Sequence, residues 1–286
     1  MILIDLNQVL LSGLMAQISG QKNVNLEEDL IRHLILNILR NHIKNFKSDY
    51  GEVVLCCDNR KYWRKDFFPF YKASRKKNRE KSNLDWNLIF NMLAKFKDEL
   101  KENFPYKVID VEGAEADDII STLVSKFGSE LNIGEKILIL SGDKDFIQLH
   151  KYEYVKQYDP TRKKWIKHED PELFLEQHIL KGDSGDGIPN VLSSDNCFVV
   201  GERQKPLTQK KIDALIELGI AGKFDHPNNR NYMRNFNLID LRNTPDDIHN
   251  KVMDSYNAQE GKDRSKLMNY FISNRLKNLT EHISEF

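Results

Sequence analysis

The sequence predicts an α/β fold, in which a central and mainly parallel sheet is flanked by helices. Short apolar runs of strand length alternate along residues 1–170 with longer segments of helical periodicity, which is the order found in parallel sheets. Three of those runs lead into aspartates, at Asp5, at Asp58 and at Asp143 with Asp145. From about residue 171 helical segments and loops replace the strand signal, so we expect a smaller helical region there.

The expected elements before residue 171 follow from hydrophobic period and turn residues. Apolar residues recur every four positions from Leu84 to Phe104, which is typical of an amphipathic helix. Asn25 with Glu28 forms a capping box that would start an earlier helix. In chain order we expect a strand at 2–6, helices at 7–19 and 25–48, a strand at 52–57, a helix at 84–104, a strand at 106–111, a helix at 116–127, a strand at 137–140, and paired edge strands at 153–158 and 164–167.

The second part of the chain should be helical. We expect helices at 172–181, 205–218 and 265–285, and another that Thr244 and Pro245 begin, with proline at its first position. After the first of these helices, three glycines and a proline within eight residues require tight turns. Bare backbone N–H groups at Gly185 and Gly187, beside a helix start, would suit a phosphate.

The composition of the chain indicates the cellular compartment in which it works. No apolar run approaches the roughly 18 residues that a membrane-spanning helix needs. Asp5 interrupts the apolar N-terminal run, and no basic residues precede it, which argues against a signal peptide. The three cysteines include the adjacent pair Cys56 and Cys57 and do not form a disulfide framework. We therefore expect a protein of a reducing cytosol that does not contact membranes.

The zero net charge hides a segregation of charge. The chain has 43 basic and 43 acidic residues, but residues 60–81 hold ten Lys or Arg and only two acids. Aromatic residues are interleaved with these cations. Rings suit stacking on bases and cations suit phosphates, so the segment predicts binding of single-stranded nucleic acid, with a solvated charge run as the alternative. Pro69 and the charge density suggest that it is mobile without ligand.

The acids near the strand ends predict a metal centre. Ligand sites in open α/β sheets form at the carboxyl ends of the strands. Carboxylates gathered there repel one another and have raised pKa values unless cations neutralise them, and oxygen ligands favour Mg2+ or Mn2+. The stretch from Glu115 to Asp145 would therefore supply half of a metal-dependent phosphodiesterase site. Its acids are Glu115, Asp117, Asp118, Asp143 and Asp145.

Several motifs together resemble the 5′ nuclease (flap endonuclease) family, and the resemblance covers essentially the whole chain. Tyr71-Lys72-Ala-Ser-Arg75 is similar to that family's arch motif, and Tyr62-Trp63-Arg64 resembles its bacteriophage branch. The other matching motifs are Ile-Asp5, Leu-Cys-Cys-Asp58, Glu115-Ala-Asp117-Asp118, Asp143-Lys-Asp145 and Gly-Asp183-Ser-Gly-Asp186-Gly-Ile-Pro.

The resemblance implies a domain layout and two metal ions. It implies a PIN-like 5′ nuclease core over residues 1–180, with a flexible helical arch at about 60–83, and a helical DNA-binding domain with a helix-turn unit over 181–286. The ions would be Mg2+, which Mn2+ can replace, and would clamp the attacking and leaving oxygens of an in-line displacement. The implied ligands are Asp5, Asp58, Glu115 and Asp117 for the first ion, Asp143, Asp145, Asp183 and Asp186 for the second, and Asp118 at the edge of the site.

The resemblance also assigns the arch. Lys72 and Arg75 match cations that reach the scissile phosphate and act in catalysis by offsetting its charge. Tyr71 would stack on a base near the break, and Arg64 would lie at the base of the arch. The other implied nucleic-acid contacts are Lys76, Lys77, Arg79, Gly185, Gly187, Lys205, Lys210 and Lys211. Asn190 stands where the family has a glycine, so we expect the helix-turn unit to be reshaped.

The implied activity is 5′-to-3′ exonuclease and flap cleavage on DNA and RNA–DNA duplexes with 5′ ends or flaps, giving 5′-phosphate products. It would remove RNA primers and adjacent DNA from lagging-strand fragments in phage replication. The protein would act as a monomer in the host cytosol, beside a phage single-stranded-DNA-binding protein. A PIN-type endoribonuclease is the alternative, but PIN domains lack the arch motif and the glycine turn. A non-catalytic nucleic-acid-binding module would not require the full set of acids.

Overall fold

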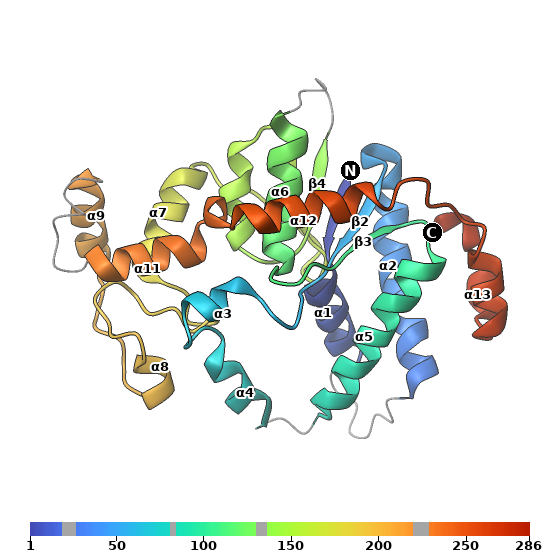
Figure 1. Cartoon of the computed structure of the whole chain (residues 1–286), viewed down its shortest axis with the longest axis horizontal. Helices are drawn as coiled ribbons and strands as arrows, with labels where there is room; N and C mark the ends of the chain where they lie inside the picture. The colour runs from blue at the N-terminus through green and yellow to red at the C-terminus, as the bar shows by residue number, and fades with distance from the viewer. Residues whose placement is uncertain (19–26, 81–83, 130–135, 220–228) are drawn as a thin grey trace.

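The computed structural model describes residues 1–18, 27–80, 84–129, 136–219 and 229–286, without the side chains of 76–78. Its centre is a six-stranded sheet of order β3-β2-β1-β4-β5-β6 (Figure 1). Neighbouring strands are parallel except for β5 and β6, which are antiparallel. The predicted mainly parallel sheet is thereby confirmed. The strands are β1 (Ile2–Asp5), β2 (Val53–Cys56), β3 (Lys107–Ile109), β4 (Ile137–Leu140), β5 (Val155–Asp159) and β6 (Lys164–Ile166).

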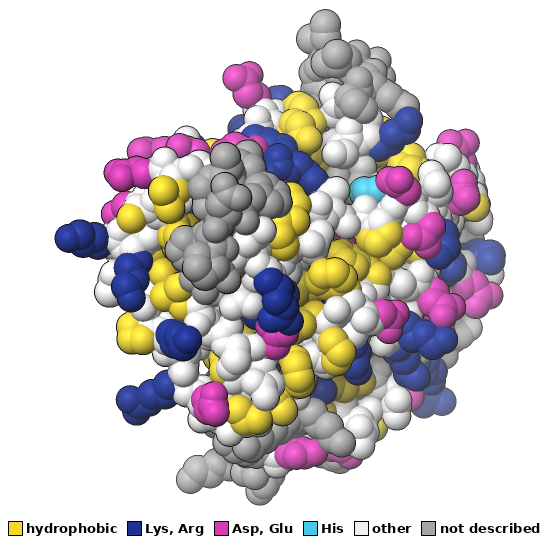
Figure 2. Space-filling view, turned by 60° about the vertical axis from the view of Figure 1, so that its left-hand side comes forward, with side chains coloured by type: hydrophobic (Ala, Val, Ile, Leu, Met, Phe, Trp, Pro, Cys, Tyr) yellow, Lys and Arg dark blue, Asp and Glu magenta, His cyan; other side chains and the backbone are white. Residues whose placement is uncertain are grey.

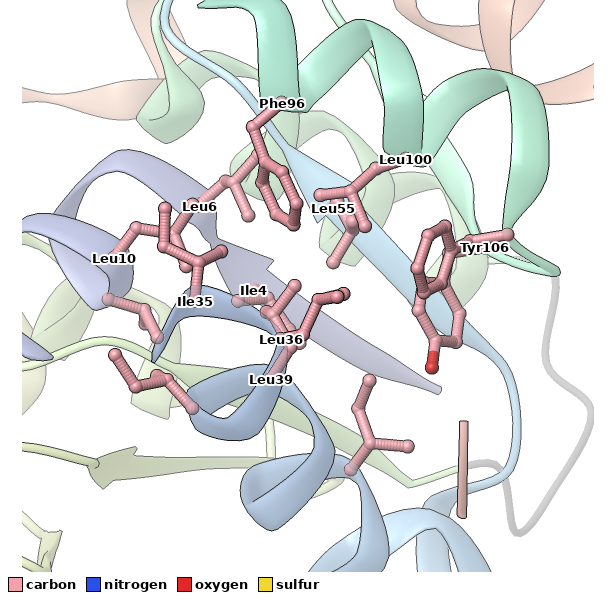
Figure 3. Close-up of a cluster of buried hydrophobic side chains, with 14 of the residues drawn as sticks. Ile4, Leu6, Leu10, Ile35, Leu36, Leu39, Leu55, Phe96, Leu100 and Tyr106 are labelled. Carbon is pink, nitrogen blue, oxygen red and sulfur yellow. The ribbon is translucent and has the colours of Figure 1, made fainter. Parts of the chain in front are cut away.

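Helices cover both faces of the sheet because strand side chains alternate between the faces. Ile2 and Ile4 of β1 join one apolar cluster with α1 (Leu6–Ile18), α2 (Glu28–Tyr50) and α5 (Trp86–Asn103). Figure 3 shows this cluster, in which Leu36 of α2 and Phe96 of α5 lie over the sheet. Leu3, between the two isoleucines, joins the opposite cluster with α6 (Ala116–Ser129).

The helices after residue 170 form two groups. The first lies beside the sheet and contains α7 (Pro171–Lys181), α8 (Cys197–Val200), α9 (Gln209–Glu217) and α11 (Asn229–Ile239). The second returns to the sheet: α12 (Asp246–Asn257) packs on α6 and β3, and α13 (Leu267–Ser273) joins the α2–α5 cluster with α14 (Lys277–Thr280). The chain after residue 240 therefore extends the α/β core.

The edge strand β3 is covered by a side chain. The amide of Gln259 accepts a hydrogen bond from the Val108 backbone N–H and donates one to the Val108 carbonyl, both at 3.0 Å. A side chain thus reproduces the pairing that a neighbouring strand would give. Glu52, Lys107 and Tyr256 support the same edge, with the Lys107 Nζ 3.0 Å from Glu52 and 3.4 Å from the centre of the Tyr256 ring.

Helix starts and one whole helix differ from expectation. The predicted capping residue Asn25 lies outside the described residues, and α2 begins at Glu28 after Glu27, which makes no side-chain cap. Helix α11 was not predicted because its sequence is rich in asparagine, a poor helix former. Tertiary contacts stabilise it instead: the buried Asn235 amide donates to the carbonyls of Ile179 and Pro189. Likewise α9 begins at Gln209 rather than at residue 205.

Short helices form the predicted basic arch and the turns around the sheet. The arch contains α3 (Trp63–Phe67) and α4 (Ala73–Glu80), which Figure 1 shows beneath the sheet and the α11 group. The remaining short elements are the 3-10 helices η1 (Asp145–Lys151), η2 (Leu241–Asn243) and η3 (Ile283–Glu285). Within the described residues, no helix combines the length and apolarity needed to cross a bilayer.

Candidate active site

The carboxyl ends of β1, β2 and β4 bring three acidic segments together. β1 lies between β2 and β4, so the chain changes direction across the sheet at this point, where α/β folds form their ligand sites. Asp5, the last residue of β1, accepts hydrogen bonds from the Gln8 backbone and the Ser141 hydroxyl, both at 3.1 Å. Asp58, beyond β2, accepts one from the Ala116 backbone at 2.9 Å. The start of α6 is thereby fixed against β2.

The glycine turn adds two more acids. Helix α7 ends at Gly182, whose φ of 67° and close approach to the carbonyl of Ile188 leave no room for a side chain. The chain then folds back on itself, with the Asp183 carboxylate accepting from the backbone N–H groups of Gly185 at 2.7 Å and Asp186 at 3.2 Å.

In the structure, the backbone N–H groups of the two glycines that we expected to meet phosphate have partners within the turn. The N–H of Gly185 is used by Asp183, and that of Gly187 donates to the Ser184 carbonyl at 3.3 Å. The glycines serve packing instead. Gly187 has a φ of 75°, and a side chain there would lie 3.0 Å from the carbonyl of Phe70 in the arch.

Burial and mutual repulsion raise the pKa values of three acids at the sheet edge. Burial, with Asp58 and Asp143 nearby, raises the pKa of Asp5 to about 8. Desolvation and the charge of Asp145 raise the pKa of Asp143 to about 7. Burial, Asp143 and Asp5 raise the pKa of Asp117 well above its usual value. Such a cluster of oxygen ligands, short of cationic partners, fits divalent metal ions.

The arch supplies cations to the other side of the same cluster. The Lys72 Nζ lies 2.5 Å from Glu115 and 3.5 Å from Asp186, and Arg75 pairs with Asp186. The Tyr71 hydroxyl lies 3.0 Å from Glu115 and 2.8 Å from Asp186. Burial raises the pKa of Asp186, but Lys72, Arg75 and Tyr71 outweigh it and lower that pKa below its usual value.

Backbone contacts fix the arch motif over the glycine turn. Lys72 adopts a φ of 54°, which is uncommon for a residue other than glycine. Its backbone N–H donates to the Asp186 carbonyl at 2.7 Å, and the Arg75 Nε donates to the Gly185 carbonyl at 3.3 Å. The two predicted catalytic cations are therefore positioned by the turn that carries two of the acids.

Arg64 and Asp118 form a buried ion pair at the base of the arch. Asp118 accepts from Arg64 and the Glu115 backbone at 2.9 Å, from the Thr244 hydroxyl at 2.8 Å and from the Trp63 indole at 3.2 Å. Four donors leave it no capacity as a metal ligand. Arg64 is 2% exposed, so its side chain serves the protein interior in this structure, and the Thr244 hydroxyl does not cap α12.

Tyr71 is also buried, so it offers no face for a base to stack on in this structure. The other predicted nucleic-acid contacts lie further out. Arg79 packs over the Phe90 ring at 5.5 Å, and Lys205, Lys210 and Lys211 are exposed near α9. The side chains of Lys76 and Lys77 lie outside the described residues. Figure 2, which turns the α7–α11 side forward, shows basic and acidic side chains dispersed among apolar ones.

Asn190 organises the loop where the family motif would continue. Its side chain donates to the Lys205 carbonyl at 2.9 Å and accepts from Leu192 at 3.0 Å and Ser193 at 2.9 Å. Its backbone N–H donates to the Gln204 side chain at 2.7 Å. A short helix, α8, lies between this loop and α9. The asparagine therefore ties the two sides of the loop together by side-chain hydrogen bonds.

Sequence reasoning missed His178, because the histidines of the chain show no metal-ligand spacing. It lies on α7, with its Nε2 3.0 Å from Asp145 and 4.0 Å from Asp183. The three side chains are close enough to share one metal ion. Burial opposes protonation, but Asp145 and Asp183 raise the pKa of this imidazole. Its position five residues before Asp183, across a helix end, was the available signal.

A cleft of about 730 Å³ opens beside Asp58. It lies between the ends of the first strands and α5, and its lining is mainly polar. Asn7, which donates to Asp58 at 3.0 Å, is one of its lining residues. The other lining residues that could meet a nucleotide are Asn59, Arg60, Asn87, Phe90, Asn91 and Lys97.

Comparisons with known proteins agree with this geometry. Residues 1–178 match the model of the 5′-3′ exonuclease N-terminal resolvase-like domain, and residues 169–286 match that of the T4 RNase H C-terminal region. The chain belongs to the 5′-3′ exonuclease family and is a phosphodiesterase of the nuclease class. The family predicted from the motifs is thereby confirmed, which decides against a non-catalytic binding module.

The relatives include a phage enzyme that matches over nearly its whole length. The chain is 40% identical to the ribonuclease H of Enterobacteria phage T4, over 99% of this chain and 95% of that protein. It is 30% identical to a 5′-3′ exonuclease of Buchnera aphidicola, over 55% and 54% of the two chains.

Among solved structures, a flap endonuclease of bacteriophage T5 in complex with DNA and metal ions superimposes with a TM-score of 0.59. It is 16% identical and covers 91% of this chain and 98% of its own. A T5 5′-exonuclease with bound zinc has the same score and identity over 91% and 99% of the two chains. At this identity the similarity shows the fold.

Proposed function

We propose that this protein is a metal-dependent 5′-to-3′ exonuclease and flap endonuclease that acts on RNA–DNA and DNA duplexes. It removes RNA primers and adjacent DNA from lagging-strand fragments in phage replication. One observation carries the proposal: acids from β1, β2, α6, β4 and the glycine turn converge at one edge of the sheet, directly beneath the cations of the arch. The ribonuclease H name of the T4 relative supports the choice of an RNA–DNA substrate.

The donor set supports two divalent ions, as Mg2+ with Mn2+ as a replacement. Asp5, Asp58, Asp117 and Glu115 would hold one ion, and the acids after β4 and in the glycine turn the other. When bound, the ions stabilise negative charge on the attacking and leaving oxygens of the phosphodiester, and hydrolysis leaves a 5′-phosphate. The second set consists of Asp143, Asp145, Asp183 and Asp186.

The arch would hold and polarise the scissile phosphate. In the structure Lys72 and Arg75 bind Glu115 and Asp186. When a phosphate enters, Lys72 and Arg75 would pair with it instead of with Glu115 and Asp186. The metal ions would then neutralise these carboxylates, so that no charge in the site is left without a partner. The cleft beside Asp58 would receive the neighbouring nucleotides of the same strand, because its amides, cations and exposed ring suit bases and phosphates.

The test compares cleavage of a labelled 5′-flap duplex, an RNA primer on DNA and a plain structured RNA, each with Mg2+. We expect cutting of the first two and 5′-phosphate ends on the products. Preferential cutting of the structured RNA would instead support a PIN-type endoribonuclease.

Asp143→Asn should abolish cleavage while sparing binding of the flap duplex. Asp110→Asn is a matched control, since Asp110 follows β3 but is paired with Lys97 and Asn59. This control should retain cleavage. Normal cleavage by the Asp143 variant would remove that residue from the site.

We also propose that the enzyme works as a monomer in the host cytosol, with a phage single-stranded-DNA-binding protein as its partner. Within the chain, residues 1–180 would carry the chemistry together with Asp183 and Asp186 of the glycine turn, and the helical part of residues 181–286 would grip duplex DNA. Sedimentation of the protein alone and with that partner tests the first part. A shortened fragment is not needed, because exposed Lys210 and Lys211 can be changed in the whole chain.

A further inference from the structure

We infer that the imidazole of His178 is a ligand of the second metal ion, and that it makes this site select Mn2+ over Mg2+. The inference rests on the proposed function, because it concerns an ion of that site. It adds to an otherwise carboxylate set a nitrogen donor that the sequence motifs did not indicate.

The geometry suits ligands of one ion. The Nε2 of His178 lies 3.0 Å from the Asp145 Oδ1 and 4.0 Å from the Asp183 Oδ2. At metal–ligand distances of about 2.1 Å, adjacent ligands of an octahedral ion lie roughly 3 Å apart and opposite ligands roughly 4.2 Å apart. Both contacts fall between these limits, and one donor atom from each residue falls within 4.8 Å of the others.

A ring contact orients the imidazole, and a backbone hydrogen bond fixes the helix end that carries it. It stacks on Phe174 one turn earlier in α7, with ring centres 5.8 Å apart and planes 24° apart. The His178 carbonyl accepts from Gly182 at 2.8 Å, which fixes the helix end that leads directly into Asp183. Asp145 lies at the start of η1, which packs along α7. Three rigid elements therefore converge on one point.

The donor chemistry sets the selectivity. Mg2+ strongly prefers oxygen ligands, whereas imidazole nitrogen suits transition metals. Replacing one oxygen by nitrogen therefore favours Mn2+ relative to Mg2+. A histidine that only oriented Asp145 by donating a hydrogen bond would not alter this preference, so the two roles can be separated experimentally.

The experiment uses the whole chain without nucleic acid and measures binding of Mn2+ and of Mg2+ by calorimetry. His178→Ala removes both the nitrogen ligand and the hydrogen bond to Asp145. His178→Gln retains a donor that can reach Asp145 but removes the imidazole. The matched control is His168→Gln, which changes an exposed histidine that packs on the same Phe174 ring. Pulsed electron paramagnetic resonance then detects imidazole nitrogen coupled to bound Mn2+.

We expect Ala and Gln at residue 178 to weaken Mn2+ binding at the second site by at least about tenfold, to weaken Mg2+ binding much less, and to remove the nitrogen coupling. The His168 variant should match the wild type. Full Mn2+ affinity in the Gln variant, or no imidazole coupling in the wild type, would overturn the inference while leaving the nuclease intact. Absence of cleavage with either ion would instead contradict the proposed function.

Discussion

Asp117 and Asp118 are neighbours in the first turn of α6 with opposite surroundings. Asp118 accepts four hydrogen bonds, and although burial opposes its ionisation, Arg64 and the other donors keep its pKa below the usual value. Asp117 faces Asp143 and Asp5, and burial with these charges raises its pKa. One acid is therefore neutralised by the protein, whereas the other requires a cation from outside. The hydrogen-bond and ion-pair partners of an acid, more than its residue type, therefore distinguish a structural carboxylate from a candidate metal ligand.

The largest expected difference comes from removing the negative charge of Asp117 and of Asp118, one at a time. Asp117→Asn should lower the single-turnover cleavage rate at least about a hundredfold, because the proposed metal ions would lose one of their ligands. The thermal unfolding temperature of this variant without metal should not fall below that of the wild type. Asp118→Asn should keep its rate per folded molecule. Equal losses of rate in the two variants would show that the comparison fails.

The buried pair should instead carry stability. Arg64→Ala leaves the Asp118 and Glu115 carboxylates without their buried partner, so we expect unfolding to become easier by about 3–5 kcal/mol. Urea denaturation at neutral pH measures this change. Lys61→Ala is the control, since that lysine pairs with Glu112 at the surface and should shift the midpoint little. A small effect at Arg64 would mean that the pair is solvated.

The arch should act on the chemical step. Lys72→Ala is expected to slow single-turnover cleavage about tenfold to a hundredfold, and to weaken binding of the flap duplex less, because we propose that Lys72 offsets charge on the reacting phosphate. Binding titration and quenched-flow rates separate the two effects. Equal losses in both would place Lys72 with the salt-sensitive cations that only hold the backbone.

The unpaired acids predict a pH dependence of opposite sign to that of an ordinary salt bridge. The pKa of Asp5 is about 8 in the folded protein and 3.8 in the unfolded chain. Between these pH values the folded protein therefore binds a proton that the unfolded chain does not. Stability of the metal-free protein should therefore fall as pH rises from about 4 to 8.

Asp5→Asn removes this term, and we expect a gain of roughly 2 kcal/mol at pH 8 and little change at pH 4. Thermal unfolding with a chelator at both pH values measures it, and Asp254→Asn, at an exposed position of α12, is the control. Added Mg2+ should stabilise the wild type more than the Asp5 variant. A variant less stable at pH 8 would contradict the raised pKa.

Much of the architecture was readable because local signals agree with it. Alternating apolar runs and helical periods predicted the sheet, and Asp5, Asp58 and Asp143 marked its carboxyl edge. The arch helices and α11 depend on contacts between distant residues, such as Arg64 with the Leu238 carbonyl at 2.9 Å. Sequence spacing does not reveal such contacts. For the same reason the sequence did not predict the hydrogen bonds that Asp118 accepts or the contact between His178 and Asp145.

The Gln259 amide against Val108 has a consequence for solubility. A bare edge of a sheet offers unpaired backbone groups to any extended segment, including one from a second molecule. Here one glutamine occupies the β3 position that an incoming strand would need. Truncating that single side chain would expose the backbone of β3, at the sheet edge opposite β6, to pairing with a second molecule and so to aggregation.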